Sequence, residues 1–397
     1  MPRELWMLLI GMVFYVTGAS FLWPLNAIYV HEELHKSLAV AGVVLMLNSA
    51  ATIVGNLLGG ILFDKWGGFR SLMLGAVTTL VAIVFLIFFH GWPAYPILLA
   101  VIGLGSGIVF PVVNAYAGAI WPEGGRRAFN AVYVAINIGV AAGSSFGGWI
   151  ASYSFEWIFI TNTLMYLLFL VVVLFGLKAV QWKSGQKPSI KNAASVSIHS
   201  RTAWRAFLIL CTGYFLCWLS YVQWSTTVAA YTQQLGLSLR QYSLLWTING
   251  VLIVLAQPLL GKLLSRWSNQ LKPQMIVGFF IFALSFLILW KASAFWHFVA
   301  AMVVLTIAEI MVWPAIPTVA SQLASQEKEG FYQGIVNSTA TAGRMIGPVL
   351  GGLVVDHAGM KPLLAILFVF VLIAILTTAI YDRKLKQESP IETKAAV

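Results

Sequence analysis

The sequence predicts an all-α integral membrane protein in which twelve transmembrane helices form two pseudo-symmetric six-helix bundles. Composition is the first observation behind this prediction, since 60% of the 397 residues are hydrophobic and only 9% are charged. An ordinary soluble domain is about one-quarter charged, and a chain this poor in charge could not cover its surface in water. Apolar stretches of membrane-spanning length and motifs that repeat at a nearly constant offset are the other two observations.

The apolar stretches define the predicted helices. A span needs about 20 apolar residues, and its backbone groups must be hydrogen-bonded internally, so each span should be a helix. Twelve stretches meet this requirement: 6–30, 38–62, 71–90, 96–119, 129–151, 156–177, 205–231, 241–263, 274–291, 296–321, 331–354 and 363–381. The first exceeds the length of a secretion signal and precedes no clear small-residue cleavage site, so we interpret it as a retained span.

The basic residues between the spans predict the topology. With both termini in the cytoplasm, nineteen fall on cytoplasmic segments: Arg3, Lys65, Arg70, Arg126, Arg127, Lys178, Lys183, Lys187, Lys191, Arg201, Arg205, Lys262, Arg266, Lys272, Lys328, Arg383, Lys384, Lys386 and Lys394. Four fall outside: Lys36, Arg240, Lys291 and Lys361. This bias explains the net charge of +11 without a nucleic-acid partner. We expect a multi-pass protein of the plasma membrane that functions as a monomer in the lipid bilayer.

A hydrophilic stretch separates two similar halves. The expected parts are an N-terminal bundle (1–177), a cytoplasmic central loop (178–204), a C-terminal bundle (205–382) and a cytoplasmic tail (383–397). Three motif pairs match across the loop: GGILFDKWGG (59–68) with LGKLLSRWSN (260–269), Phe110-Pro111 with Trp313-Pro314, and GSSFGG (143–148) with GPVLGG (347–352). The offsets are 201, 203 and 204 residues. Two repeated halves are typical of transporters that rock about a central site.

Over essentially its whole length the sequence resembles the major facilitator superfamily. The family pattern after the second span, approximately G-x-L-x-D-R/K-x-G-R/K, matches Gly60, Asp64, Lys65 and Gly67, and Arg70 stands two places beyond the usual second basic position. The resemblance implies that this loop is a conformational latch whose aspartate steadies one state against the eleventh span. A solvated aspartate that caps the third span locally is the alternative.

Two family motifs depart from the expected pattern. The GPxxGG-like element of exporters is Gly143, Ser144, Ser145, Phe146, Gly147 and Gly148 in the fifth span, whereas the full form, Gly347, Pro348, Val349, Leu350, Gly351 and Gly352, is in the eleventh. We expect these glycines to allow close helix packing. The fourth-span arginine that many family antiporters use for proton coupling is absent from AVIGLGSGIVF (100–110). Any coupling to protons must therefore use another residue.

Glu309 and Arg344 are the formal charges near the middle of predicted spans ten and eleven. Intramembrane ionisable groups are costly and usually mark a substrate pathway or a proton relay. Apolar surroundings favour the neutral acid, and a nearby arginine favours the carboxylate, so the two could form a protonation switch. The repeat places Gly105 or Ser106 opposite Glu309 in the first half. A structural ion pair that never titrates is the alternative.

Helical phase predicts the side chains that line a substrate cavity. The candidates are Asn26, Tyr29, Asn114, Tyr214, Trp218, Tyr221, Trp246, Asn249, Trp313, Asn337 and Thr341. Aromatic faces beside a carboxylate suit bulky amphipathic cations. Periodic aromatic residues in membrane helices also serve as packing groups or interfacial belts, which is the alternative.

The sequence around span ten is similar to multidrug exporters of the drug:proton antiporter branch, in which a glutamate contributes to cation binding and proton coupling. We therefore expect proton-coupled export of lipophilic or cationic small molecules by alternating access, with the proton as coupling ion and no further cofactor. A carrier of a specific metabolite, sugar or lipid-linked substrate is the alternative, and a non-transporting sensor on the same scaffold is a further one. No P-loop is present, which argues against ATP-driven transport.

A short motif offers a different function. The segment His31-Glu32-Glu33-Leu34-His35 matches the HExxH signature of zinc peptidases, which would make the chain a membrane metalloprotease. The motif falls in the short external connection between the first two spans, and a catalytic zinc needs a third ligand. We expect a solvated loop, no metal site and no enzymatic activity.

Overall fold

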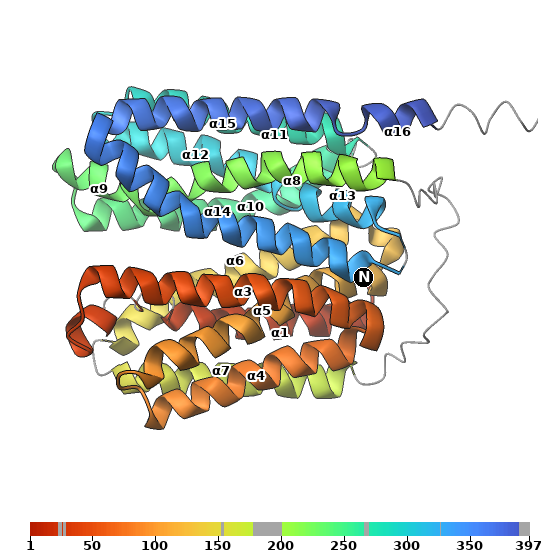
Figure 1. Ribbon diagram of the computed structural model, residues 1–397. Coiled ribbons are helices and arrows are strands. Elements are labelled where there is room, and N and C mark those ends of the chain that lie inside the picture. Colours follow the sequence, from red (N-terminus) through yellow and green to blue (C-terminus); the bar gives the residue numbers. More distant parts are fainter. Residues whose placement is uncertain are drawn as a thin grey trace, which may run out of the picture. The chain divides into compact units, whose positions relative to one another are not determined.

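The computed structural model describes residues 1–22, 26, 29–151, 155–177, 201–265, 270–325 and 327–388 (Figure 1). Most of the predicted central loop (residues 178–200) and the end of the predicted tail (residues 389–397) lie outside the described residues. All regular elements that these ranges form are helical. The predicted all-α fold class is therefore confirmed.

The helices follow the predicted spans closely. They are α1 (Arg3–Leu22), η2 (Tyr29–Glu33), α3 (Leu38–Trp66), α4 (Gly68–Phe88), α5 (Ala94–Ile120), η3 (Pro122–Gly124), α6 (Arg126–Ala151), α7 (Phe155–Leu177), α8 (Arg201–Tyr221), η4 (Val222–Ser225), α9 (Thr227–Gln234), α10 (Leu239–Ser265), α11 (Leu271–Trp290), α12 (Phe295–Val312), α13 (Ala315–Leu323), α14 (Glu329–Ala358), α15 (Met360–Ile380) and α16 (Arg383–Glu388). Within the described residues, ten helical stretches are long and apolar enough to cross a membrane. Helices α10 and α14, of 27 and 30 residues, occupy the eighth and eleventh predicted spans.

Two predicted spans are divided rather than continuous. The tenth breaks at Pro314, between α12 and α13, because proline has no N–H to donate to the preceding turn. The seventh breaks at η4, where the Gln223 side chain donates hydrogen bonds to the carbonyl oxygens of Leu219 (3.1 Å) and Gly347 (2.7 Å). A buried side-chain amide thus satisfies backbone groups where the regular helix ends.

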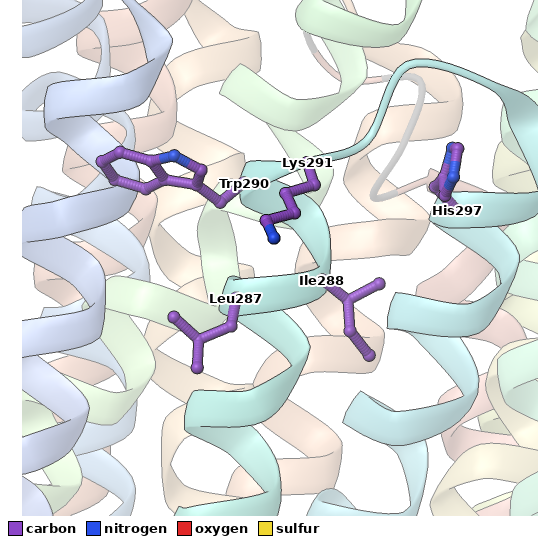
Figure 2. A pocket seen from close by; sticks show the side chains of 5 residues that line it. All are labelled: Leu287, Ile288, Trp290, Lys291 and His297. Atoms are coloured by element: carbon purple, nitrogen blue, oxygen red, sulfur yellow. The ribbon is translucent and has the colours of Figure 1, made fainter.

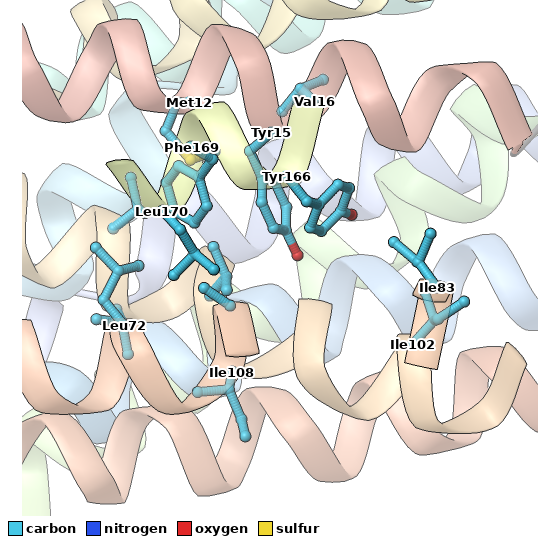
Figure 3. Packing of buried hydrophobic residues seen from close by; sticks show 14 of the residues in the cluster. Met12, Tyr15, Val16, Leu72, Ile83, Ile102, Ile108, Tyr166, Phe169 and Leu170 are labelled. Carbon is cyan, nitrogen blue, oxygen red and sulfur yellow. The ribbon is translucent and has the colours of Figure 1, made fainter. Parts of the chain in front are cut away.

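Internal contacts group the chain into two compact units, each described here by itself. The first comprises Met1–Ile190 and Gln326–Thr341, and the second comprises Lys191–Ser325 and Ala342–Val397. In the first unit α5 packs against α3 and α4, and α1 packs against α6 and α7. Tyr15 of α1 lies at the centre of this core, with ring centroids 4.7 Å from Tyr166 and 4.9 Å from Phe169 (Figure 3).

Glycines allow a close helix crossing in the first unit, between α3 and α5. An added Cβ at Gly55 would lie 2.9 Å from the Cα of Gly107, and one at Gly59 would lie 2.6 Å from the carbonyl oxygen of Ile108. Real Cβ atoms do not approach neighbours this closely. Small residues spaced four apart are the usual means by which membrane helices bring their backbones together.

The second unit is built around α11, which packs against α12 and α15, while α8 packs against α15 and α10 against α12. One charged contact joins the first turn of α11 to the end of α15. Lys272 forms an ion pair with Asp382 and donates to the carbonyl oxygen of Ala379 at 2.6 Å. This pair joins the beginning of α11 to the residues that follow α15.

Candidate functional site

Glu309 lies at the centre of the α12–α13 span, fourteen residues from Phe295 and fourteen from Leu323. Glu309 is only 1% exposed to solvent. The Asn249 amide of α10 donates to Glu309 Oε1 at 3.1 Å and to Thr306 Oγ1 at 2.9 Å. The Tyr221 side chain of α8 is close enough to interact with Glu309. Two neighbouring helices, α10 and α8, therefore contribute polar groups next to this buried carboxyl group.

An aromatic cluster borders this carboxyl group. We define it as Tyr214, Trp218 and Tyr221 of α8, Phe282 of α11 and Trp313, which follows α12. The indoles of Trp218 and Trp313 are stacked with centroids 4.8 Å apart and planes within 5° of parallel. The ring centroids of Tyr214, Tyr221 and Phe282 lie 5.7, 5.5 and 6.2 Å from that of Trp313. Trp313 is thus the hub of a five-ring cluster one helical turn from Glu309.

Arg344 of α14 contacts the same cluster. Its guanidinium carbon lies 4.7 Å from the centroid of the Trp218 ring, within the range of a cation–π interaction. Tyr214 and Tyr221 are close enough to interact with its charge. The two charges singled out from the sequence therefore border one cluster, Glu309 through Tyr221 and Arg344 through Trp218.

The two repeat counterparts of Glu309 in the first half, Gly105 and Ser106, have different surroundings. Gly105 lies on α5 against α4, where an added Cβ would come within 2.9 Å of the carbonyl oxygen of Gly75 and of the backbone nitrogen of Thr79. The hydroxyl of the neighbouring Ser106 donates to the carbonyl oxygen of Gly103 at 3.0 Å. A larger side chain at Gly105 would need α4 and α5 to separate.

Other predicted cavity residues lie in different surroundings. Asn26 accepts a hydrogen bond from the Tyr95 hydroxyl at 2.7 Å, and the centroid of the Tyr29 ring lies 4.7 Å from that of Tyr95, with the planes tilted by 34°. Both therefore pack against the beginning of α5, which agrees with the packing alternative. Asn114 is half-buried on α5.

Asn337 and Thr341 share a face of α14 with Arg344 in sequence, but their recorded contacts differ from those of Arg344. Both belong to the first unit and Arg344 to the second. The hydroxyl of Thr341 lies 3.4 Å from the side-chain amide of Asn56 of α3, and Asn337 donates to the carbonyl oxygen of Gln333 at 2.9 Å. Helical phase alone did not reveal this division along α14.

The segment predicted as a loop forms the last turn of α3, Gly67 and the first turn of α4, and it contacts α14 through Asp64 of α3. One carboxylate oxygen accepts the backbone N–H of Gly330 at 2.8 Å, and the other accepts that of Phe331 at 2.9 Å. These amides belong to the first turn of α14, where N–H groups have no partner within the helix and a negative charge is favoured. An added Cβ at Gly60 would lie 2.7 Å from the carbonyl carbon of Gly330, so the two backbones nearly touch. Gly67 turns the chain into α4 with a φ of 83°.

The basic residues of this segment, Lys65 of α3 and Arg70 of α4, are exposed.

The packing glycines differ from one another. Gly143 faces Thr17 and Ser20 of α1, whereas Gly347 and Gly351 face Val222 and Gln223 of the second unit. The remaining members of the two motifs lie on α6 and α14: Gly147, Gly148, Pro348 and Gly352. The surroundings of Gly147 and Gly148 are outside the described part of the chain, and a Cβ at Gly352 would meet no described atom within 4 Å.

The HExxH segment lies in and after η2. His31 and His35 are exposed, and His31 Nδ1 lies 2.8 Å from the carbonyl oxygen of Lys36. Within the described ranges, no group of three or more His, Cys, Asp or Glu side chains is arranged to hold a metal ion.

A shallow cavity of about 680 Å³ lies at the end of α11 and the beginning of α12 (Figure 2). Its lining residues are Leu287, Ile288, Trp290, Lys291 and His297. His297 precedes Glu309 by twelve residues, or about 18 Å along the helix. This cavity is therefore separate from the site around Glu309.

Three residues near Glu309 and the aromatic cluster were not among the candidates predicted from the sequence. Thr306 shares a hydrogen-bond donor with Glu309, and its position three residues earlier on the same face was a usable signal. Tyr242 accepts from the Trp246 indole at 2.9 Å and donates to the carbonyl oxygen of Trp224 at 2.9 Å. Phe282 is one of 25 phenylalanines, and no local pattern distinguishes it.

A helical membrane protein with ionisable groups buried at mid-span and with an internally repeated sequence is, as a class, a membrane transporter and not an enzyme. The model of the Major Facilitator Superfamily matches residues 8–272 and 210–396, and the chain belongs to this superfamily. It is 54% identical over the full length of both chains to the uncharacterized MFS-type transporter YttB of Bacillus subtilis.

More distant relatives agree with this assignment. A Na(+), Li(+), K(+)/H(+) antiporter of Planococcus maritimus is 27% identical over 87% of this chain and 88% of its own. The crystal structure of a bacterial homologue of the iron transporter ferroportin, in an outward-facing state, matches 96% of this chain and 100% of its own with a TM-score of 0.77 at 16% identity. The similarity to the ferroportin homologue shows a shared fold only.

Proposed function

We propose that this transporter exchanges protons for cationic, lipophilic small molecules and exports them, with Glu309 as the group that holds either the proton or the cation. The observation that supports the proposal best is a buried carboxyl group that accepts a hydrogen bond from Asn249 and borders an aromatic cluster. Electron-rich ring faces attract organic cations, and the carboxylate supplies the opposite charge.

Exchange follows from the cost of a lone charge at this position. A buried carboxylate is unfavourable without a compensating positive charge, so Glu309 is stable either protonated or beside a cation. Proton and substrate therefore exclude each other. A proton that arrives from the more acidic side would release the bound cation, and deprotonation on the other side would restore the binding site. Movement of the two halves of the superfamily fold would expose the site to each side in turn.

A second candidate is exchange of protons for monovalent metal cations. The relative from Planococcus maritimus carries this activity in its name. Asn249, Thr306 and Glu309 would offer the oxygen atoms that hard cations prefer. The aromatic cluster has no role in binding a small hydrated ion, which is why we favour organic cations.

The test uses purified protein in liposomes with an imposed pH gradient. Ethidium efflux and proton release after addition of NaCl or KCl are measured for the wild type, Glu309→Gln and the control Asp356→Asn, which removes an exposed carboxylate on α14. We expect gradient-driven ethidium transport to fall to the level of empty liposomes in Glu309→Gln alone. Transport that is unchanged in this variant refutes the assignment to Glu309. Proton release by the metal ions without ethidium transport favours the second candidate, and no response to either class favours a specific metabolite carrier.

A further inference from the structure

The aromatic cluster already contains a cation that belongs to the protein. The Arg344 guanidinium carbon lies 4.7 Å from the centroid of the Trp218 ring, and Tyr214 and Tyr221 are close enough to interact with its charge. These are the ring faces that an organic cation would need in the proposed function. A guanidinium and a second cation repel each other and cannot share one ring face.

We propose that Arg344 is a tethered occupant of the cation subsite, and that a cationic substrate must displace it from Trp218 in order to bind. The inference rests on the proposed function for the class of substrate. It assigns to Arg344 a regulatory role, since its guanidinium would cover the Trp218 ring in the empty state and would lower the affinity for substrate.

Close packing restricts how Arg344 can leave. The adjacent Gly343 abuts α8, where an added Cβ would lie 3.2 Å from the carbonyl oxygen of Phe215 and closer still to the Trp218 side chain. One turn later, Gly347 faces Val222 and Leu219. The α14 backbone is therefore held against α8 on both sides of Arg344. Displacement requires rotation of the long, half-buried arginine side chain, not separation of the helices.

The chemistry of the side chain suits this role. Guanidinium is planar, permanently charged and weakly hydrated, so it stacks on an indole and can leave it at moderate cost. A purely structural arginine is the competing explanation, in which the contact with Trp218 only fixes α14 to α8. The two explanations predict opposite effects on substrate affinity when the charge is removed.

The experiment measures equilibrium binding of tetraphenylphosphonium to purified wild type, Arg344→Gln, Arg344→Met and Arg344→Lys. We expect the two neutral variants to bind about 5- to 30-fold more tightly than the wild type, because the substrate no longer competes with a cation–π contact. Arg344→Lys keeps a competing cation and should remain near the wild-type value. Methylguanidinium added to Arg344→Gln should weaken binding again. Lys291→Gln, an exposed lysine removed from the site, is the matched control and should bind as the wild type does.

Size-exclusion profiles and thermal unfolding identify the variants that fold, and either neutral variant suffices. Unchanged or weaker binding in a folded neutral variant refutes displacement, even if Glu309→Gln abolishes transport as expected. Binding in neither the wild type nor the neutral variants refutes both this inference and the organic-cation function. The two failures are thus distinguishable in one set of measurements.

Discussion

Replacing Asp64 with alanine should release the first turn of α14 from α3. The carboxylate accepts two backbone N–H groups of α14, at 2.8 Å from Gly330 and 2.9 Å from Phe331. Loss of a side-chain cap of this kind costs about 0.5–2 kcal/mol, and the interaction of its charge with the helix terminus adds about 0.3–1 kcal/mol. The local opening free energy at these amides should therefore fall by about 1–3 kcal/mol.

Hydrogen exchange measures this change directly. At about 1.4 kcal/mol per factor of ten, the amides of Gly330 and Phe331 should exchange roughly 5- to 150-fold faster in Asp64→Ala. Asp64→Asn keeps one carbonyl acceptor without the charge and should give a smaller increase. Arg70→Ala, which removes an exposed side chain from the first turn of α4, should leave hydrogen exchange at Gly330 and Phe331 unchanged. Unaltered protection of residues 329–333 in a folded Asp64→Ala protein would refute the reasoning.

Three further predictions concern the interior. Asn249→Leu should slow proton-driven transport about 10- to 100-fold, as a hydrogen bond to an ionisable group is worth about 1.5–3 kcal/mol, and normal rates would contradict the role of its contact with Glu309. Gly107→Ala should lower thermal stability by about 1–3 kcal/mol through overpacking of α3 against α5, whereas Gly352→Ala should not; equal melting temperatures would refute the contact. Lys272→Met should cost about 1 kcal/mol, less at high salt, measured by thermal unfolding; a salt-independent loss would show that packing, not charge, is responsible.

The sequence was sufficient to predict the helices because each span is long and nearly uncharged, and that signal does not depend on tertiary contacts. It was less informative at helix breaks. Pro314 visibly interrupts its span, but the break after Tyr221 depends on where the Gln223 amide finds acceptors, including Gly347 more than a hundred residues later. Such a partner is defined only once the helices pack.

The sequence identified those residues of the candidate site whose types are rare within apolar spans. Glu309 and Arg344 stand alone among apolar neighbours, and their types made them visible. Phe282 contributes a ring to the cluster through the rotation of α11, which no spacing in the sequence reveals. Thr341 follows the helical phase of Arg344 yet contacts Asn56 of α3, because a face of one long helix can meet different neighbours along its length.

The tight packing at Gly105 has an evolutionary consequence. If the two halves descend from a duplicated ancestral unit, a single codon change cannot give the first half a carboxyl group at this position, because even a methyl group would collide with α4. Replacement of Thr79 and a shift of α4 away from α5 would have to come first, because the contact at Gly75 is with its backbone carbonyl oxygen. New substrate ranges should therefore arise more readily on the α12 side of the repeat than at Gly105.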